Sequence, residues 1–134
     1  MRAALVTGAA RRLGREMALY LARRGHDVAI HYSGAQAEAE ATAADARAHG
    51  VKAVALQADL LDEAQTETLV ARAADALGGP LTVLVNNAST FDYDNIRSAS
   101  RASWDRNLGS NLRAPFVLTQ TFAARMPEAL RGPE

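Results

Sequence analysis

The sequence predicts an α/β fold built on a doubly wound parallel sheet with helices on both faces. Three observations lead to this prediction. Short, nearly continuous apolar segments recur along the chain, a stretch with helical periodicity follows each of them, and glycine or polar residues separate the two. Apolar strands that alternate with helices are typical of parallel sheets, and right-handed crossovers give the doubly wound arrangement.

The first strand is predicted at residues 3–6, after which Leu13, Met17 and Leu21 recur at helical spacing and Gly25 closes the helix. The same alternation continues, with strands expected at 28–32, 51–56 and 81–86 and helices at 36–48 and 62–77.

A polar, turn-rich loop at 88–100 and a long helix at 101–126 follow the fourth strand. No further strand returns to the sheet after this helix. We therefore expect a Rossmann-type domain truncated after the helix that follows strand 4, so that residues 1–134 are one domain and the front part of a longer one.

Composition excludes several classes of protein. Lys+Arg 15 against Asp+Glu 15 gives a net charge of zero, which argues against a non-specific nucleic-acid binder or a basic helix on a membrane surface. The absence of cysteine excludes disulfides and thiolate metal sites, and we expect no metal. No apolar run approaches the roughly 20 residues of a membrane span. We expect a cytoplasmic protein without nucleic-acid or membrane partners.

The strongest local signal lies between the first strand and the first helix, where residues 7–14 read TGAARRLG. Gly8 permits a tight turn, and the small side chains of Ala9 and Ala10 let a phosphate approach the backbone. Gly14 allows the helix to pack closely against the strand. Free N–H groups and the helix dipole favour a dinucleotide pyrophosphate at this point. The alternative is an ordinary turn between a strand and a helix.

This segment resembles the Thr-Gly-x-x-x-Gly-x-Gly pattern of the short-chain dehydrogenase/reductase family, with Arg12 in place of the middle glycine. Arg11 and Arg12 before Leu13-Gly14 are similar to the pteridine reductase branch. The resemblance implies that Arg12 contacts both the pyrophosphate and a substrate beside the nicotinamide, and that Leu13 lies against the cofactor. The alternative is a solvated Arg, although a cation at a helix N-terminus opposes the dipole unless an anion is present.

The end of the second strand indicates the cofactor. An NAD enzyme places an Asp or Glu here for the ribose hydroxyls, but residues 28–37 contain neither. The segment instead contains His31, Tyr32 and Ser33. We expect NADP(H), with Arg11 and Ser33 at its 2′-phosphate. The pair His31-Tyr32 also resembles the pteridine reductases, although either residue alone could simply fill a strand end.

Two further strand ends carry candidate residues. Asp59 and Leu60 stand where the family places an Asp near the adenine amino group, although Asp59 could equally be a helix N-cap. Asn87, Ala88 and Ser89 match the family's Asn-Asn-Ala-Gly motif, with Ser89 in place of glycine. An isolated Asn-Asn could instead be a turn.

The resemblance to the pteridine reductases also implies that Ser89 and Phe91 line the substrate pocket, where the Phe91 ring would stack on a flat heterocycle.

Asn111 lies in the predicted long helix, four residues before Pro115. Since proline has no N–H, the Asn111 carbonyl is left free and the helix is expected to kink there. In the family this Asn holds a water in a proton relay to the catalytic Tyr and Lys, so Asn111 is the candidate catalytic residue. A kink without a catalytic role is the alternative.

The family's catalytic pair is missing from these residues. Lys52 is the only lysine, and none of the tyrosines precedes it by four residues, so this polypeptide alone is not expected to turn over by the family mechanism. The resemblance implies hydride transfer to a C=N or C=O bond of a small molecule, most specifically a pterin or dihydrofolate. A general carbonyl reductase or a non-catalytic dinucleotide-binding module are the alternatives, and a homodimer or tetramer is expected.

Overall fold

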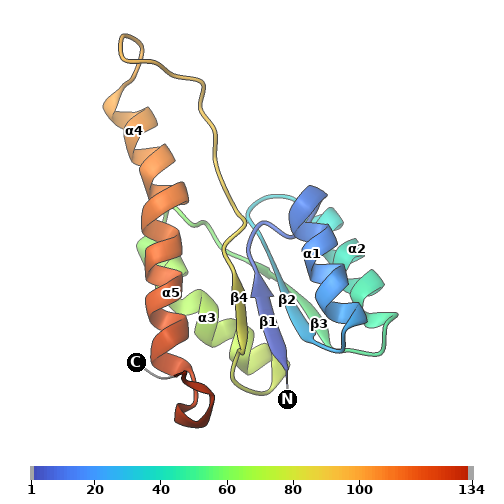
Figure 1. The fold of residues 1–134 in the computed structure, drawn as a ribbon. Coiled ribbons are helices and arrows are strands. Elements are labelled where there is room, and N and C mark those ends of the chain that lie inside the picture. The colour runs from blue at the N-terminus through green and yellow to red at the C-terminus, as the bar shows by residue number, and fades with distance from the viewer. Residues whose placement is uncertain (1, 133–134) are drawn as a thin grey trace.

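The computed structural model describes residues 2–132. Its sheet has four parallel strands in the order β3-β2-β1-β4 (Figure 1), and these are β1 (Ala3–Val6), β2 (Asp27–Tyr32), β3 (Ala53–Gln57) and β4 (Val83–Val85). In the central register, Leu5 of β1 lies between Ala29 of β2 and Leu84 of β4. The order reverses between β1 and β4, which confirms the predicted doubly wound, Rossmann-type sheet.

Helices cover both faces of the sheet (Figure 1). They are α1 (Arg12–Arg23), α2 (Gln36–Arg47), α3 (Glu63–Leu77), α4 (Arg101–Leu108) and α5 (Ala114–Arg125). The first two pack on one face, and α3 and α5 pack on the other. Over the described residues, no helix combines the length and the apolar character needed to cross a bilayer.

The core consists of small aliphatic side chains in two layers. Ala4 and Val6 of β1 join the layer beneath α1 and α2. Ala3 and Leu5, which alternate with them along the strand, join the layer beneath α3 and α5. Because both faces of β1 are buried, the strand reads as a continuous apolar run, which is the pattern that predicted it.

The boundaries of β2, β3 and β4 differ from the predicted ones: β2 begins one residue earlier, at Asp27, and β3 ends one residue later, at Gln57. Val51 precedes β3, which begins at Ala53. The fourth strand is limited to Val83–Val85 rather than 81–86, because it pairs with only three residues of the short strand β1.

The prediction of a single α-helix over 101–126 is wrong in its middle. A π-helical turn, η1 (Gly109–Arg113), separates α4 from α5, and the Ala114 amide bonds to the Gly109 carbonyl five residues back. This turn directly precedes Pro115, whose missing N–H interrupts the regular ladder. A short 3₁₀ turn, η2 (Glu128–Leu130), follows α5 and was not expected.

Candidate functional site

A cavity of about 810 Å³ lies at the carboxyl edge of the sheet, lined by the segments that follow all four strands. Every residue expected from the sequence to contact the cofactor lines it: Gly8, Arg11, Arg12, Leu13, Gly14, His31, Tyr32, Ser33, Asp59, Leu60, Asn87, Ala88 and Ser89. The cavity also spans the point where the strand order reverses, which is where open α/β sheets bind ligands.

Two glycines allow the loop after β1 to lie close to its neighbours. Gly8 has a φ of 61°, and a Cβ added there would lie 2.9 Å from the Ala88 Cα atom. A Cβ at Gly14 would overlap the Gly8 carbonyl oxygen and approach Nδ2 of Asn87 to 2.5 Å. The two glycines therefore let the loop after β1, the start of α1 and the segment after β4 pack closely together beside the cavity.

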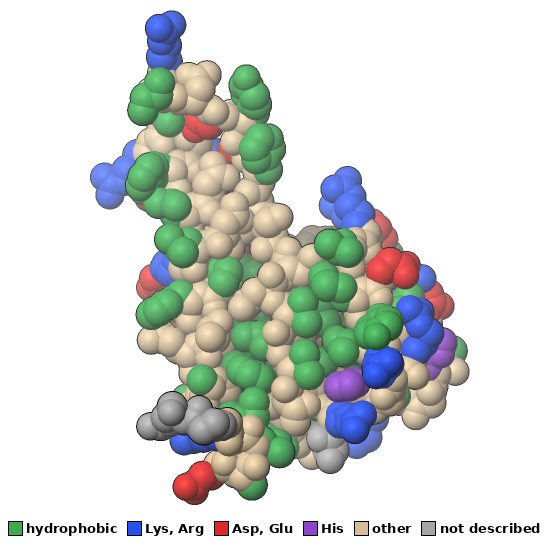
Figure 2. Space-filling view, in the orientation of Figure 1, with side chains coloured by type: hydrophobic (Ala, Val, Ile, Leu, Met, Phe, Trp, Pro, Cys, Tyr) green, Lys and Arg blue, Asp and Glu red, His purple; other side chains and the backbone are tan. Residues whose placement is uncertain are grey.

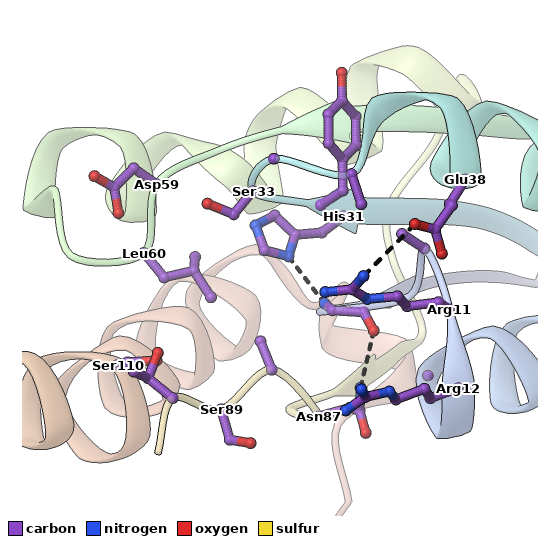
Figure 3. A pocket seen from close by; sticks show the side chains of 18 of the residues that line it. Arg11, Arg12, His31, Ser33, Glu38, Asp59, Leu60, Asn87, Ser89 and Ser110 are labelled. Atoms are coloured by element: carbon purple, nitrogen blue, oxygen red, sulfur yellow. Dashed lines mark hydrogen bonds and ion pairs between the residues drawn. The ribbon is translucent and has the colours of Figure 1, made fainter. Parts of the chain in front are cut away.

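Thr7 and Asn87 fasten the loop after β1 to the loop after β4. The Thr7 hydroxyl oxygen accepts hydrogen bonds from the amides of Asn87 at 3.0 Å and Ala88 at 2.9 Å. In return, the Asn87 side-chain amide donates to the Thr7 carbonyl at 3.0 Å and, as Figure 3 shows, to the Gly8 carbonyl at 3.1 Å. The Asn87 amide group therefore orients the loop backbone.

His31 supports the same loop from beneath. Its Nδ1 atom accepts a hydrogen bond from the Gly8 amide at 3.0 Å (Figure 3). Its Nε2 atom lies 2.9 Å from the Ala58 carbonyl oxygen. Because a carbonyl can only accept, the proton lies on Nε2 and the ring is neutral. Burial lowers the pKa of His31 below its usual value, which also favours the neutral ring. Both ring nitrogens are thus engaged within the protein.

The helix that follows the loop begins with two arginines. No side chain caps the N-terminus of α1, at which Arg11 is the N-cap residue. Arg12 has a φ of 56°, a left-handed backbone conformation that residues other than glycine rarely adopt. The uncapped N-terminus and the two guanidinium groups make this end of the cavity suited to an anion.

Glu38 joins this corner of the cavity from the first turn of α2. Its Oε1 atom lies 3.6 Å from Nη1 of Arg11, and Figure 3 shows the two side chains directed toward one another. Asp59 and Leu60 lie at the other end of the cavity in this view.

The Asp59 carboxylate accepts the Leu61 amide at 2.9 Å. The N-cap of α3 is Asp62, whose side chain accepts the amides of Ala64 and Gln65, so the alternative that made Asp59 the N-cap is wrong. These hydrogen bonds, with one from the Gln65 side chain as the largest contribution, lower the pKa of Asp62.

Phe91 and Asn111 lie outside the residues that line the cavity. The Phe91 side chain is 83% exposed. Asn111 uses its side chain to hold the loop after β4: its Oδ1 atom accepts the Thr90 amide at 2.8 Å, and its Nδ2 atom donates to the Thr90 carbonyl at 2.7 Å. From η1 it is the neighbouring Ser110 that reaches the cavity.

The polar residues Thr7, Glu38, Thr90 and Ser110 of this site had no role predicted from the sequence. Thr7 belongs to the motif, and its hydroxyl could have been assigned from that position. Glu38 was missed because it follows residues 28–37, the segment in which an acid for the ribose is expected. It lies in the first turn of α2, which places it at the cavity. Ser110 had no sequence signal, since its place depends on the π-helical turn.

Comparison with known proteins gives a consistent result. The family model for short chain dehydrogenases matches residues 2–133. The 3-oxoacyl-[acyl-carrier-protein] reductase FabG of Staphylococcus aureus is 34% identical over 125 residues, covering 93% of this chain and 50% of that protein. The chain spans about half the length of the curated relatives it matches.

Two solved structures have NADP bound. FolM alternative dihydrofolate reductase 1 from Brucella suis, in complex with NADP, is 38% identical with a TM-score of 0.86, covering 95% of this chain and 52% of that one. A short chain dehydrogenase from Burkholderia cenocepacia, also in complex with NADP, is 38% identical with a TM-score of 0.90, covering 95% and 51%. With its sheet order, its glycine-rich loop and a family match along nearly its whole length, the chain belongs to the short-chain dehydrogenase family.

Proposed function

We propose that these residues are the cofactor-binding part of an NADP(H)-dependent oxidoreductase that transfers hydride to a C=O or C=N bond of a small molecule. The observation that carries the proposal is the convergence of all the expected cofactor residues on one cavity at the reversal of strand order. NADP in the Brucella and Burkholderia structures supports the choice of cofactor. When bound, this cofactor supplies the hydride.

The corner formed by Arg11 and Ser33 supports a preference for NADP(H). Both residues line the cavity, and the guanidinium and hydroxyl groups are donors suited to a 2′-phosphate. The N–H groups at the start of α1 and the Arg12 guanidinium would hold the pyrophosphate. His31 and Asn87 act through the loop: by bonding to Gly8 they keep its backbone in place for the cofactor.

We further propose a pterin or dihydrofolate as the substrate. Arg12 and Ser89 line the cavity, and the exposed ring of Phe91 is free to stack on a flat heterocycle. The likeness to the Brucella dihydrofolate reductase favours this substrate class. Its likeness to FabG favours a carbonyl reductase as the second candidate. Reduction of dihydrobiopterin, compared with a 3-oxoacyl thioester, by the protein together with any residues that follow Glu134 separates the two.

The residues of this chain bind and orient rather than complete the chemistry. The sequence contains no tyrosine four residues before a lysine, so residues 1–134 supply no such proton donor. Asn111 remains the proposed contributor to a proton relay, through its carbonyl next to Pro115. Without a catalytic pair from elsewhere, the chain would function as a dinucleotide-binding module.

We also propose that a second copy of the chain covers the outer face of α4, η1 and α5. Trp104, Leu108, Leu112 and Phe116 recur there every four residues and are exposed. Figure 2 shows hydrophobic side chains along the outer margin of this helical column. A stripe of this kind is typical of surfaces buried by association, which supports the expected homodimer or tetramer.

Titration of the 134-residue chain with NADPH and NADH tests the proposed cofactor site. We expect saturable binding of NADPH, and Arg11→Gln should weaken it by about tenfold while changing NADH binding little, since a charge-assisted bond contributes roughly 1.5 kcal/mol. Arg24→Gln is the matched control, because Arg24 contacts the Tyr20 ring rather than the cavity. Equal losses for both dinucleotides would contradict the 2′-phosphate assignment.

A further inference from the structure

We propose that Glu38 limits the preference of this site for NADP(H), by competing with the 2′-phosphate for the Arg11 guanidinium. The inference rests on the proposed cofactor site and adds to it a residue that determines specificity. The inference follows from the ion pair between Glu38 and Arg11, both of which line the cavity.

The geometry places the two side chains in one solvated corner of the cavity. Arg11 is the N-cap residue of α1, Glu38 lies in the first turn of α2, and their nearest charged atoms are 3.6 Å apart. The side chains are 60% and 52% exposed, so both can change rotamer without repacking the core. Figure 3 shows this pair on one side of His31 and Ser33 on the other.

The neighbouring arginine does not substitute for Arg11 in this pair. Arg15 also extends from α1 toward α2, but its guanidinium donates to the Thr42 hydroxyl at 2.9 Å and to the Asp45 carboxylate at 2.5 Å. Thr42 in turn donates to the Ala10 carbonyl at 2.9 Å, so this second contact between α1 and α2 holds the loop. Of the two arginines, Arg11 is therefore the one whose contact with α2 can be exchanged for a ligand.

The competition has a definite sign. A 2′-phosphate that binds Nη1 of Arg11 displaces the Glu38 carboxylate from it, whereas a cofactor that ends in a ribose hydroxyl leaves that ion pair in place. The cost falls on NADPH alone. An exposed ion pair contributes about 0.2–1 kcal/mol, so removing the competing carboxylate should tighten NADPH binding by a factor between about 1.4 and 5.

Glu38→Gln tests the proposal, because glutamine keeps the size of the side chain and removes its charge. Glu40→Gln is the control: it makes the same change of charge on the same helix, at an exposed residue that does not line the cavity. The dissociation constants of the 134-residue chain for NADPH and NADH are measured by calorimetry at low and high salt. We expect Glu38→Gln to tighten NADPH at low salt and to leave NADH unchanged, and the gain should shrink at high salt.

A second arm tests the part played by Arg11. In the Arg11→Gln background the gain from Glu38→Gln should disappear, since no guanidinium is left to release. A gain that persists there, or a response of Glu38→Gln equal to that of Glu40→Gln, would overturn the inference and leave the cofactor site standing. Failure of the unmodified chain to bind either dinucleotide would instead overturn the proposed function itself.

Discussion

Arg12 has a backbone conformation that favours glycine, although its guanidinium group lines the cavity. Its φ of 56° places it in the left-handed region, where a residue with a Cβ costs about 1–2 kcal/mol relative to the right-handed region. The family pattern has a glycine at this position, and glycine adopts the conformation without strain. Strain kept at the mouth of a cavity indicates that the side chain serves the site rather than the fold.

Arg12→Gly should therefore raise the free energy of unfolding by about 1 kcal/mol while weakening NADPH binding. Arg12→Ala is the matched variant, since it removes the guanidinium but keeps the strained backbone. It should weaken binding without raising stability. Denaturant unfolding and calorimetric titration of both variants check this, and a loss of stability in Arg12→Gly would contradict the assignment of strain.

His31 is the second residue with a specific consequence, which concerns pH. Its ring is buried and neutral in the folded chain, and its pKa is lowered mainly by desolvation, then by the positive charge of Arg72, while the bond to Ala58 raises it. The unfolded chain therefore takes up a proton on this residue at a higher pH than the folded chain does. The contribution of His31 to the free energy of unfolding is therefore greatest above about pH 6.5 and falls as the pH drops below that value.

His31→Gln removes this titration and should flatten the decline of stability between about pH 6.5 and pH 5. His49→Gln, at an exposed position, should leave the decline as it is. Chemical denaturation across this range measures both. Equal slopes for the unmodified chain and His31→Gln would mean that the imidazole is not the group responsible.

At the scale of elements, the loop after β4 is fastened to the helical column beside it. Thr90 pairs with Asn111 through its backbone and bonds to Ser110 through its hydroxyl at 3.0 Å. Two residues further on, the Asp92 carboxylate accepts the Arg106 guanidinium at 2.8 Å. These contacts attach the loop after β4 to α4 and η1.

Asn111→Ala should loosen this attachment. The Thr90 amide loses its acceptor, and its hydrogen exchange should accelerate by about three- to tenfold, because a hydrogen bond contributes roughly 1 kcal/mol. Asn107→Ala is the control, since Asn107 accepts only the Asp92 amide at 3.3 Å and should leave the Thr90 amide protected. Hydrogen exchange followed by NMR measures both variants. Unchanged exchange of the Thr90 amide in Asn111→Ala would show that its hydrogen bond to Asn111 does not stabilise the loop.

The helical column also marks the limit of what sequence can predict about elements. The missing N–H of Pro115 predicted an irregularity near Asn111, and an irregularity is present. Its form, a π-helical turn over Gly109–Arg113, was not predictable, because it depends on how α5 packs on α3 and the sheet. That turn decides that Ser110 reaches the cavity.

At the scale of the whole molecule, the sheet and its two covered faces follow from local patterns. Apolar runs such as residues 3–6 had to be strands buried on both faces, and the helix-forming segments between them are long enough for parallel crossovers. The cavity follows from this topology, because parallel strands bring their carboxyl ends to one edge. The pattern of apolar residues could not predict side-chain contacts between different elements, such as the ion pair between Glu38 and Arg11.

The central claim is that the cavity at this edge binds a dinucleotide with its phosphates at the start of α1. Amide chemical shifts of the isotopically labelled chain, recorded during titration with NADP⁺, test it most directly. We expect saturable shifts that are largest at the amides of Gly8 and of residues 11–14, with smaller ones at Ser33 and Asp59. Shifts confined to the outer face of α4 and α5, or no saturable shift at all, would contradict it.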